Sequence, residues 1–423
     1  MARKILLMSM NVGGGHTALR DAFATSLQRL DPEGTRFEVM SIESRDEATL
    51  AFYKWVVRYL TPFQWVVHRF SDSELVLRMM MFKERQGLVV EAEELLRTHQ
   101  PDVVVSTHLI LTAALVYARN RLGSPAKVLT AIPDYGEPTS GFFPGRPSIR
   151  PDGAIAMEEV AHRAVVGFGH APAERILLGG FLPRQPFELQ GARLGDRRRL
   201  PPEERAALAR SLVTEFPQLE AYDASRPTLI FLGGSAWTEK TLPVLERVLA
   251  DRALADATNL LVVAGNNPEF HADLVRRTRG HATAMPFGFL APEVLATLLA
   301  LSDVPVLGSL APATLHELLE LRVGPLLLFH YIPGTEGPHV DYLHAQRLGL
   351  YEPDPDRMIH HVREALGHAP PSGPLRALMD GFGPAAAALR EAHRERALAL
   401  GPFLEQFVPD REAAAAEGLR VAS

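Results

Sequence analysis

The sequence of 423 residues contains no cysteine. Disulfide bonds and thiolate metal sites are therefore excluded, and the composition suits a reducing compartment, so we expect the cytoplasm by default. An excess of positive charge is also missing, because 44 Lys and Arg residues stand against 50 Asp and Glu residues and the net charge is -6. Bulk binding of nucleic acid is not expected, since no domain-wide excess of cations is available to neutralise phosphates.

Long apolar runs are missing as well. No stretch approaches the roughly 20 uninterrupted apolar residues that a membrane-spanning helix requires. The apolar run 5–8 ends before Asn11 and the glycines that follow it, so we expect no signal peptide. With 47% hydrophobic residues the chain is still able to bury two cores of ordinary size, and its length predicts two domains.

Short aliphatic runs alternate with helical patterns along most of the chain. This alternation predicts an α/β fold with a parallel, doubly wound sheet in each of two Rossmann-like domains. The strands expected in the first half are 4–10, 36–42, 101–107, 127–133, 152–157 and 175–179. Those expected in the second half are 227–233, 259–264, 282–286, 303–307 and 325–330.

The alternation lapses between Pro183 and Pro227 into a charged, proline-containing stretch with three arginines at 197–199. The predicted organisation is a first domain over 1–183, a linker over 184–226, a second domain over 227–383 and a helical tail over 384–423. Two such domains in tandem are expected to form an interdomain cleft for a ligand at the carboxyl ends of their sheets.

A glycine-rich turn follows the first predicted strand, where Gly13, Gly14 and Gly15 precede His16. An apolar run, glycines and a helical pattern predict a strand, a tight loop and a helix, a unit that brings backbone N–H groups near a phosphate. Short loops also follow predicted strands of the second domain, at Gly233-Gly234-Ser235, Gly265-Asn266, Phe287-Gly288-Phe289 and 308–314.

Several motifs occur in a fixed order: Gly13 to His16, Pro101 to His108, Gly233-Gly234-Ser235, Ala264-Gly265-Asn266, Thr314 with Glu317, and Ile332 to Glu336 with Asp341 and Tyr342. Together they resemble the diacylglycerol glycosyltransferase family, which includes monogalactosyldiacylglycerol synthases and processive diacylglycerol glucosyltransferases. The resemblance implies the GT-B fold and an inverting transfer of a hexose from a UDP-hexose donor to a lipid acceptor, either diacylglycerol or a glycosyl-diacylglycerol.

Two loops depart from the pattern of that family. Where the family usually has a Lys-Pro-Gly-Gly loop, this chain has the sequence Gly-Ser-Leu-Ala-Pro at 308–312. Where the family usually has Pro-Gly-Gln-Glu, this chain has Pro-Gly-Thr-Glu at 333–336, and the asparagine that normally follows is absent. The resemblance is therefore to a divergent member, in which the choice of sugar can differ.

The resemblance makes His16 the general base that takes the proton of the acceptor hydroxyl. Inverting sugar transfer needs such a base together with stabilisation of the leaving diphosphate. At a helix N-terminus the imidazolium form is disfavoured, so the ring stays able to accept a proton. The structural alternative is a histidine that caps a helix or is buried against the backbone.

The resemblance assigns the donor to the loops of the second domain and to the glycines beside the base. The carboxylate of Glu317 is expected at the start of a helix, where it accepts hydrogen bonds from both ribose hydroxyls. Turn glycines, a helix-terminal charge and solvated loop residues are the structural alternatives. The predicted donor-binding residues are Gly14, Gly15, Gly233, Gly234, Ser235, Gly265, Asn266, Phe287, Gly288, Phe289, Ser309, Thr314, Glu317, Thr335, Glu336 and Asp341.

Aromatic and basic residues alternate between residues 50 and 85, a segment with two of the three tryptophans. Such a segment can lie among the headgroups of an anionic membrane while its charges stay hydrated, and a peripheral position on the cytoplasmic membrane face is expected. A pair of amphipathic helices packed on the first domain is the alternative. The predicted acceptor and membrane contacts are Trp55, Arg58, Trp65, Arg69, Asp134 and Tyr135.

Two other functional classes stay open at this point. A non-hydrolysing UDP-sugar epimerase shares the two-domain fold but needs no lipid surface, and a catalytically silent UDP-sugar-binding protein binds without turnover. No metal or other cofactor is expected, because helix dipoles and backbone amides can manage the leaving diphosphate. Asp354-Pro355-Asp356 has the form of a metal-binding Asp-X-Asp, but its proline-rich context favours a turn.

Replacement of Trp55 and Trp65 together by Ala should weaken co-sedimentation with anionic liposomes. Raised salt should weaken binding of the parent protein as well, because salt screens the attraction between basic side chains and the membrane surface. A folded double variant that sediments as fully as the parent would place the membrane contact elsewhere.

Overall fold

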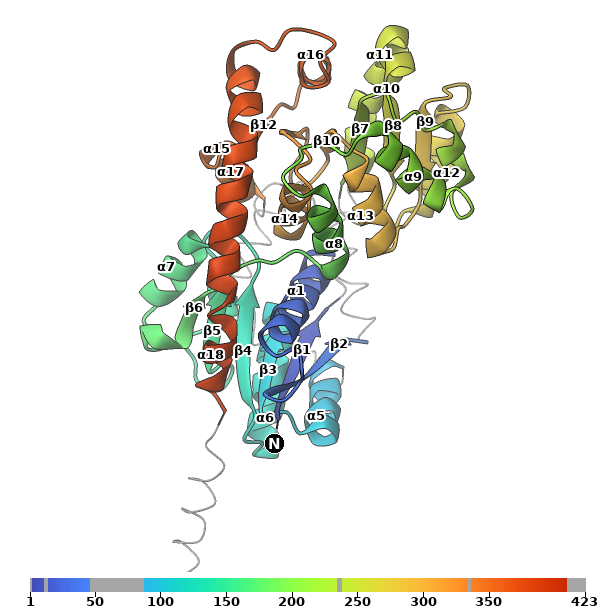
Figure 1. The fold of residues 1–423 in the computed structure, drawn as a ribbon. Helices are drawn as coiled ribbons and strands as arrows, with labels where there is room; N and C mark the ends of the chain where they lie inside the picture. The colour runs from blue at the N-terminus through green and yellow to red at the C-terminus, as the bar shows by residue number, and fades with distance from the viewer. Residues whose placement is uncertain (1, 11–13, 46–86, 234–237, 333–335, 409–423) are drawn as a thin grey trace, which may run out of the picture. The chain divides into compact units, whose positions relative to one another are not determined.

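The computed structural model divides into two compact units. Unit 1 consists of residues 1–182 and 392–423, and unit 2 consists of residues 183–391. Each unit contains one six-stranded parallel sheet with helices between the strands (Figure 1). The α/β class and the two doubly wound parallel sheets are therefore confirmed. The structure describes residues 2–10, 14–45, 87–233, 238–332 and 336–408.

Unit 1 begins with alternating strands and helices. In chain order these are β1 (Arg3–Ser9), α1 (Gly14–Leu30), β2 (Phe37–Glu43), α5 (Leu88–His99), β3 (Val103–Ser106), α6 (Leu109–Leu122), β4 (Lys127–Ile132), η3 (Ser140–Phe142), β5 (Gly153–Ala156), α7 (Glu159–Gly167), η4 (Ala173–Arg175) and β6 (Ile176–Leu178). The strand order across the sheet is β2-β1-β3-β4-β5-β6. All six strands coincide with predicted strands to within two residues.

The central strands of unit 1 are covered by helices, and this explains their almost continuous apolar sequences. Val104 of β3 is fully buried in one core cluster with Leu111 and Leu115 of α6. Helix α6 ends at Gly123, whose positive φ of 62° suits a residue without a Cβ atom. The chain then returns to begin β4 beside β3.

Unit 2 repeats the same alternation. Its elements are α8 (Gln185–Leu194), α9 (Pro202–Leu212), η5 (Pro217–Ala221), β7 (Thr228–Leu232), η6 (Thr238–Thr241), α10 (Leu242–Ala250), α11 (Arg252–Ala257), β8 (Asn259–Val263), α12 (Pro268–Arg277), β9 (Ala284–Phe287), α13 (Pro292–Ala300), β10 (Val304–Leu307), α14 (Pro312–Glu320), β11 (Leu326–Leu328), α15 (Gly337–Ala345), β12 (Gly349–Tyr351), α16 (Pro355–Ala365) and most of α17 (Gly373–Ala397). The strand order is β12-β11-β10-β7-β8-β9. Strand β12 was not predicted, because Gly349-Leu350-Tyr351 contains no aliphatic run such as the three leucines of β11.

The charged stretch 184–226, predicted as a linker, is packed into unit 2 instead. Its helix α9 contributes Arg205, whose side chain is only 1% exposed. One guanidinium nitrogen of Arg205 donates to the hydroxyl of Thr228 at 2.7 Å and to the carbonyl of Leu301 at 2.9 Å. A charged residue therefore serves as a core residue here, with both terminal guanidinium nitrogens bonded to oxygen atoms of unit 2.

The last described residues return to unit 1 through α17 and α18 (Leu400–Glu405). His393 is buried, and its Nδ1 accepts a hydrogen bond from the backbone N–H of Phe181 at 2.9 Å. Burial lowers the pKa of His393 to about 3, so the ring is neutral at pH 7. A Cβ atom on Gly180 would lie 1.8 Å from the carbonyl oxygen of His393, so this close approach requires glycine.

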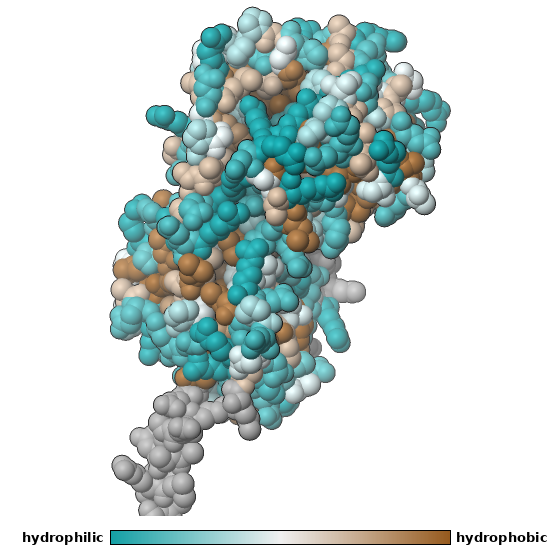
Figure 2. All heavy atoms as spheres, viewed as in Figure 1, coloured by the Kyte–Doolittle hydropathy of each residue, from teal (hydrophilic) through white to brown (hydrophobic). Residues whose placement is uncertain are grey.

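Large exposed apolar side chains are scattered over the described surface, on elements such as α5, α7, α8 and α12. On the face drawn in Figure 2, hydrophilic side chains surround small groups of hydrophobic ones in each unit. Within the described ranges, every helix is too short or too polar to cross a membrane.

Replacement of Gly180 by Ala should lower the free energy of unfolding by about 1–3 kcal/mol, because the new methyl group overlaps the backbone at His393. Replacement of Gly167 by Ala is the matched control, since a Cβ atom there meets nothing within 4 Å. Urea unfolding of both variants measures the difference. Equal stability of the two variants would contradict the close packing of α17 on β6.

Candidate functional site

The carboxyl ends of β1, β3 and β4 bring polar side chains to one edge of the unit 1 sheet. The register pairs Met8 with Ser106 and Ser106 with Thr130, so these strands end at nearly the same level. His108 follows β3 and Asp134 follows β4. His16 lies in the first turn of α1, which begins at Gly14, so the predicted strand and helix on either side of residues 11–13 are confirmed.

The ring of His16 is held by the backbone that follows β3. Its Nδ1 atom lies 2.6 Å from the carbonyl oxygen of Thr107. The hydroxyl of Thr107 in turn donates to the carbonyl of His16 at 3.3 Å. Because a carbonyl oxygen only accepts hydrogen bonds, the proton of the neutral ring is assigned to Nδ1, and Nε2 carries the lone pair.

The surroundings keep both histidine rings of this edge neutral. Burial lowers the pKa of His16, while the negative charge of Asp134 and the bond to Thr107 raise it by less. Burial, together with the neighbouring His16, lowers the pKa of His108 to about 3, although Asp134 acts in the opposite direction. The two rings meet edge to face, with centroids 5.1 Å apart. At pH 7 the cluster therefore contains two uncharged imidazoles near one carboxylate.

His108 was not among the predicted site residues, although it ends the motif 101–108. It caps α6, because its Nδ1 accepts from the backbone N–H of Ile110 at 3.3 Å. Its position directly after a buried strand is the sequence signal that could have identified it. The structure thus gives His108 a packing role against His16, the residue predicted as the base.

The predicted acceptor residues divide into two groups. Asp134 is half-buried and Tyr135 is buried, both just beyond β4 at the same edge as His16. Trp55, Arg58, Trp65 and Arg69 lie outside the described residues, and their role stays a prediction.

In unit 2, Glu317 is the sixth residue of α14, which begins at Pro312, rather than a residue of its first turn. Its carboxylate is buried, and the Nε atom of Arg184 donates to Oε1 at 2.6 Å. The guanidinium of Arg184 also lies over the ring of Phe187 at 4.9 Å from its centroid. Sequence reasoning missed Arg184, because it stands in the stretch interpreted as a linker.

Glu336, at the N-cap of α15, is buried and joined to the loop after β10. It accepts hydrogen bonds from the hydroxyl of Ser309 and from the backbone N–H of Ile332, the latter at 2.8 Å. Burial raises the pKa of Glu336, and the bond from Ser309 and the nearby His339 lower it again. Asp341, the other predicted acid of this region, is exposed on α15.

The remaining predicted donor loops lie at the carboxyl ends of their strands. Gly233 is buried at the end of β7, and Gly265 follows β8 with a positive φ of 64°. Asn266 is exposed, while the next residue, Asn267, caps α12 by accepting from Phe270 N–H at 2.9 Å. Thr314 is half-buried in the first turn of α14. Gly234, Ser235 and Thr335 lie outside the described residues.

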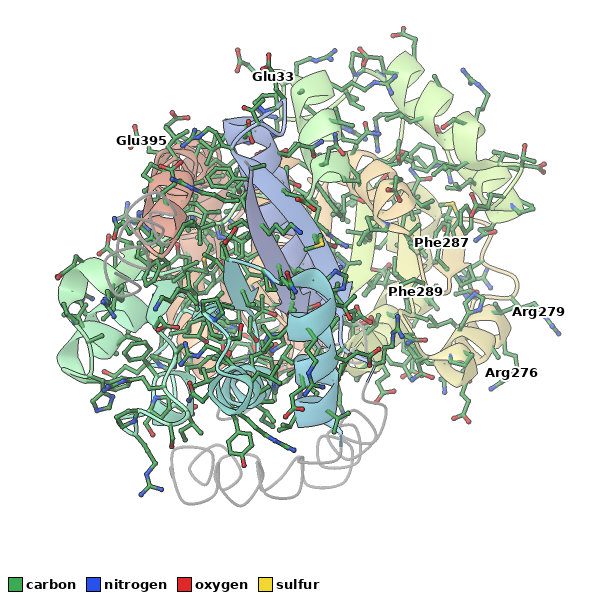
Figure 3. The ribbon with its side chains drawn as sticks, turned by 90° about the horizontal axis from the view of Figure 1, so that it is seen from below. Glu33, Arg276, Arg279, Phe287, Phe289 and Glu395 are labelled. Carbon is green, nitrogen blue, oxygen red and sulfur yellow. The ribbon has the colours of Figure 1, made fainter. Side chains whose placement is uncertain are left out.

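Two aromatic residues mark the end of β9. Phe287 is buried, whereas Phe289 is 72% exposed, and Gly288 separates them. In Figure 3 both rings lie near this end of the sheet, and Arg276 and Arg279 lie further out around α12. An exposed aromatic ring at a strand end provides a flat apolar surface on which a planar group can stack.

The Asp-X-Asp sequence at 354–356 lies at the start of α16. Asp354 caps α16 by accepting from the backbone N–H groups of Asp356 and Arg357. Asp356 pairs with Arg247, so the Asp-X-Asp sequence forms a helix cap and a surface ion pair. In the part of the chain that the structure describes, no three His, Asp or Glu side chains are grouped so that they could hold a metal ion.

No family model and no curated protein sequence matches the chain. Among solved structures, it is similar to the glycotransferase of kitacinnamycin, with 13% identity, a TM-score of 0.56, and coverage of 97% of this chain and 100% of that one. It is also similar to UDP-GlcNAc 2-epimerase from Neisseria meningitidis bound to UDP-GlcNAc, with 12% identity, a TM-score of 0.54, and coverage of 93% and 100%. It is similar as well to α,α-trehalose 6-phosphate synthase from Burkholderia multivorans, with 13% identity and a TM-score of 0.54. That match covers 99% of this chain and 98% of the other. The chain therefore has the GT-B fold.

Replacement of Arg184 by Met should destabilise unit 2 by about 2–4 kcal/mol, because the buried carboxylate of Glu317 loses its ion-pair partner. Replacement of Arg276 by Met removes an exposed pair with Asp273 and should change stability by less than about 1 kcal/mol. Thermal unfolding of the two variants provides the measurement. If Arg184→Met loses no more stability than Arg276→Met, the ion pair between Arg184 and Glu317 is screened by solvent.

Proposed function

We propose that the protein is an inverting glycosyltransferase that moves a hexose from a UDP-sugar to a lipid acceptor, with His16 as the general base. The observation that carries this proposal is the bond from His16 Nδ1 to the carbonyl of Thr107. It directs the proton to Nδ1 and the lone pair to Nε2, as a base requires. The lowered pKa of His16 keeps that lone pair available at neutral pH.

In the proposed reaction, the acceptor hydroxyl gives its proton to Nε2 of His16 while its oxygen attacks the anomeric carbon of the donor sugar. The new glycosidic bond forms as the bond from that carbon to the diphosphate breaks, and UDP leaves. The imidazolium that forms is stabilised by the negative charge of Asp134 and by the carbonyl of Thr107. A base of this kind contributes about 10²–10⁴-fold to the rate.

A sugar nucleotide as donor is supported by the similar structures, which include a glycotransferase and an epimerase bound to UDP-GlcNAc. In this chain we assign the ribose to Glu317, whose carboxylate is oriented by Arg184. The lipid acceptor is supported by the aromatic and basic residues between 50 and 85. Membrane lipid is the acceptor class that such a segment suits best.

An epimerase is the second candidate, because several of the similar structures are UDP-GlcNAc 2-epimerases. The two reactions differ in their need for an acceptor. The protein should be incubated with a panel of UDP-sugars, with and without total lipid extract, and both the lipids and the nucleotides analysed by mass spectrometry and chromatography. A hexosylated lipid supports the transferase, and an isomerised UDP-sugar formed without lipid supports the epimerase. Binding of UDP-sugars with neither product would identify a catalytically silent protein.

Replacement of His16 by Ala should reduce sugar transfer by about 10²–10⁴-fold and leave the affinity for UDP nearly unchanged. Turnover is measured with the lipid product, and UDP binding by calorimetry. Replacement of His170, a half-buried histidine whose Nδ1 bonds to the carbonyl of Phe143, is the matched control. Near-normal turnover of the variant at position 16 would eliminate this residue as the base.

The pH dependence provides a separate check on His16. Its pKa is lowered from 6.5, so the unprotonated ring still predominates when the pH falls to 6.5. The decline of transfer at acidic pH, measured as kcat/KM, should therefore be centred below pH 6.5. A decline centred at or above pH 6.5 would contradict the lowered pKa.

A further inference from the structure

The carboxylate of Glu336 connects two separate loops of unit 2. One oxygen accepts from the hydroxyl of Ser309, in the loop between β10 and α14, and the backbone N–H of Leu310 in that loop also bonds to the carboxylate. The other oxygen accepts from the backbone N–H of Ile332, in the segment that follows β11. Glu336 is only 5% exposed, so these bonds replace most of its hydration. The carboxylate therefore holds the two loops together from inside.

Two histidines make further connections between the same loops. The Nδ1 atom of His330, just after β11, donates to the carbonyl of Gly308 at 3.0 Å. The Nδ1 atom of His339, in α15, donates to the carbonyl of Leu310 at 2.8 Å. Amide, hydroxyl and carbonyl groups of the four-residue segment 308–311 thus all form hydrogen bonds with the chain that follows β11. Few backbone conformations satisfy all these bonds at once.

Ser309 is the part of this arrangement that the family resemblance does not supply. The loop usual in that family, Lys-Pro-Gly-Gly, contains no hydroxyl group, whereas the loop of this chain has one at Ser309. The hydroxyl of Ser309 donates to a carboxylate oxygen of Glu336, whereas the resemblance would assign that carboxylate to the donor sugar. In this chain, one carboxylate oxygen of Glu336 is therefore already bound by Ser309 of the other loop.

We propose that Glu336 is a positioning residue, which fixes the loop 308–311 for the part of the donor common to all UDP-sugars and does not bind the sugar itself. The inference rests on the proposed function for the identity of the donor. Because the bonds of Glu336 go to the protein, its removal affects UDP, UDP-glucose and UDP-galactose equally. A direct contact with sugar hydroxyls would instead affect only the two sugar-bearing ligands.

Calorimetry with UDP, UDP-glucose and UDP-galactose tests the proposal on Glu336→Gln and Ser309→Ala. Each variant should weaken all three affinities by the same factor, roughly tenfold, the effect of one hydrogen bond to a charged group. Ser309→Thr keeps the hydroxyl and should bind nearly as the parent does. Glu246→Gln makes the same chemical change on the surface, where Glu246 pairs with Arg277, and should have no effect. Weakening confined to the two sugar-bearing ligands would overturn the proposal.

Hydrogen exchange of the backbone amides in 308–311, measured without ligand, tests the fixed loop independently of any donor. Exchange should be roughly tenfold faster in Ser309→Ala than in Ser309→Thr, since a lost bond of this strength increases local opening by that factor. Equal exchange in the two variants would overturn the proposal, even if Glu336→Gln fails to fold. If the parent binds neither UDP nor UDP-sugars, the proposed function fails, and the exchange result alone decides whether Glu336 holds the loop.

Discussion

Parallel pairing of the strands is the constraint on which both units depend. A parallel strand cannot return directly to its neighbour, so crossover connections, most of them through an α-helix, join the strands, and the carboxyl ends of all strands lie at the same edge of their sheet. In unit 1 this brings the residues after β1, β3 and β4 together, although they are about 100 positions apart in the sequence. In unit 2 it brings the segments after β10 and β11 into hydrogen-bonding distance. The polar chemistry of each unit is a consequence of this shared edge.

Buried polar groups at the carboxyl ends of the two sheets are stabilised in different ways. In unit 1, burial removes charge, since His16 and His108 are both kept neutral and the proton of His16 is held by a backbone carbonyl. In unit 2, buried acids are surrounded by donors, Arg184 for Glu317 and a hydroxyl with backbone amides for Glu336. A neutral imidazole is suited to exchanging a proton, whereas the carboxylate of Glu336, whose donors all belong to the protein, is suited to holding two loops in place.

Much of the fold could be predicted because buried parallel strands leave a strong apolar signal. Among the described residues, eleven of the twelve strands were predicted in this way, while β12 begins with glycine and has no aliphatic run. The charged stretch 184–226 was misinterpreted because periodicity does not reveal that Arg205 and Arg184 find partners inside unit 2. The place of His16 followed from local sequence, but the bond to Thr107 joins residues 91 positions apart and needs the folded sheet. Pairing across loops, as between Ser309 and Glu336, leaves no local pattern at all.

The return of the chain to unit 1 through α17 has a consequence for how the protein is made. Residues 392–408 supply buried groups to unit 1, among them His393 and Phe407, whose ring would touch a Cβ atom placed on Gly153. Unit 2 is encoded without interruption by 183–391, so on the ribosome its sequence is complete first. Unit 1, although its synthesis begins earlier, lacks part of its core until residues 392–408 have been made. While residues 183–391 are being made, the nascent chain therefore carries an incomplete unit 1, and a chain that ends at residue 391 has the full sequence of unit 2 only.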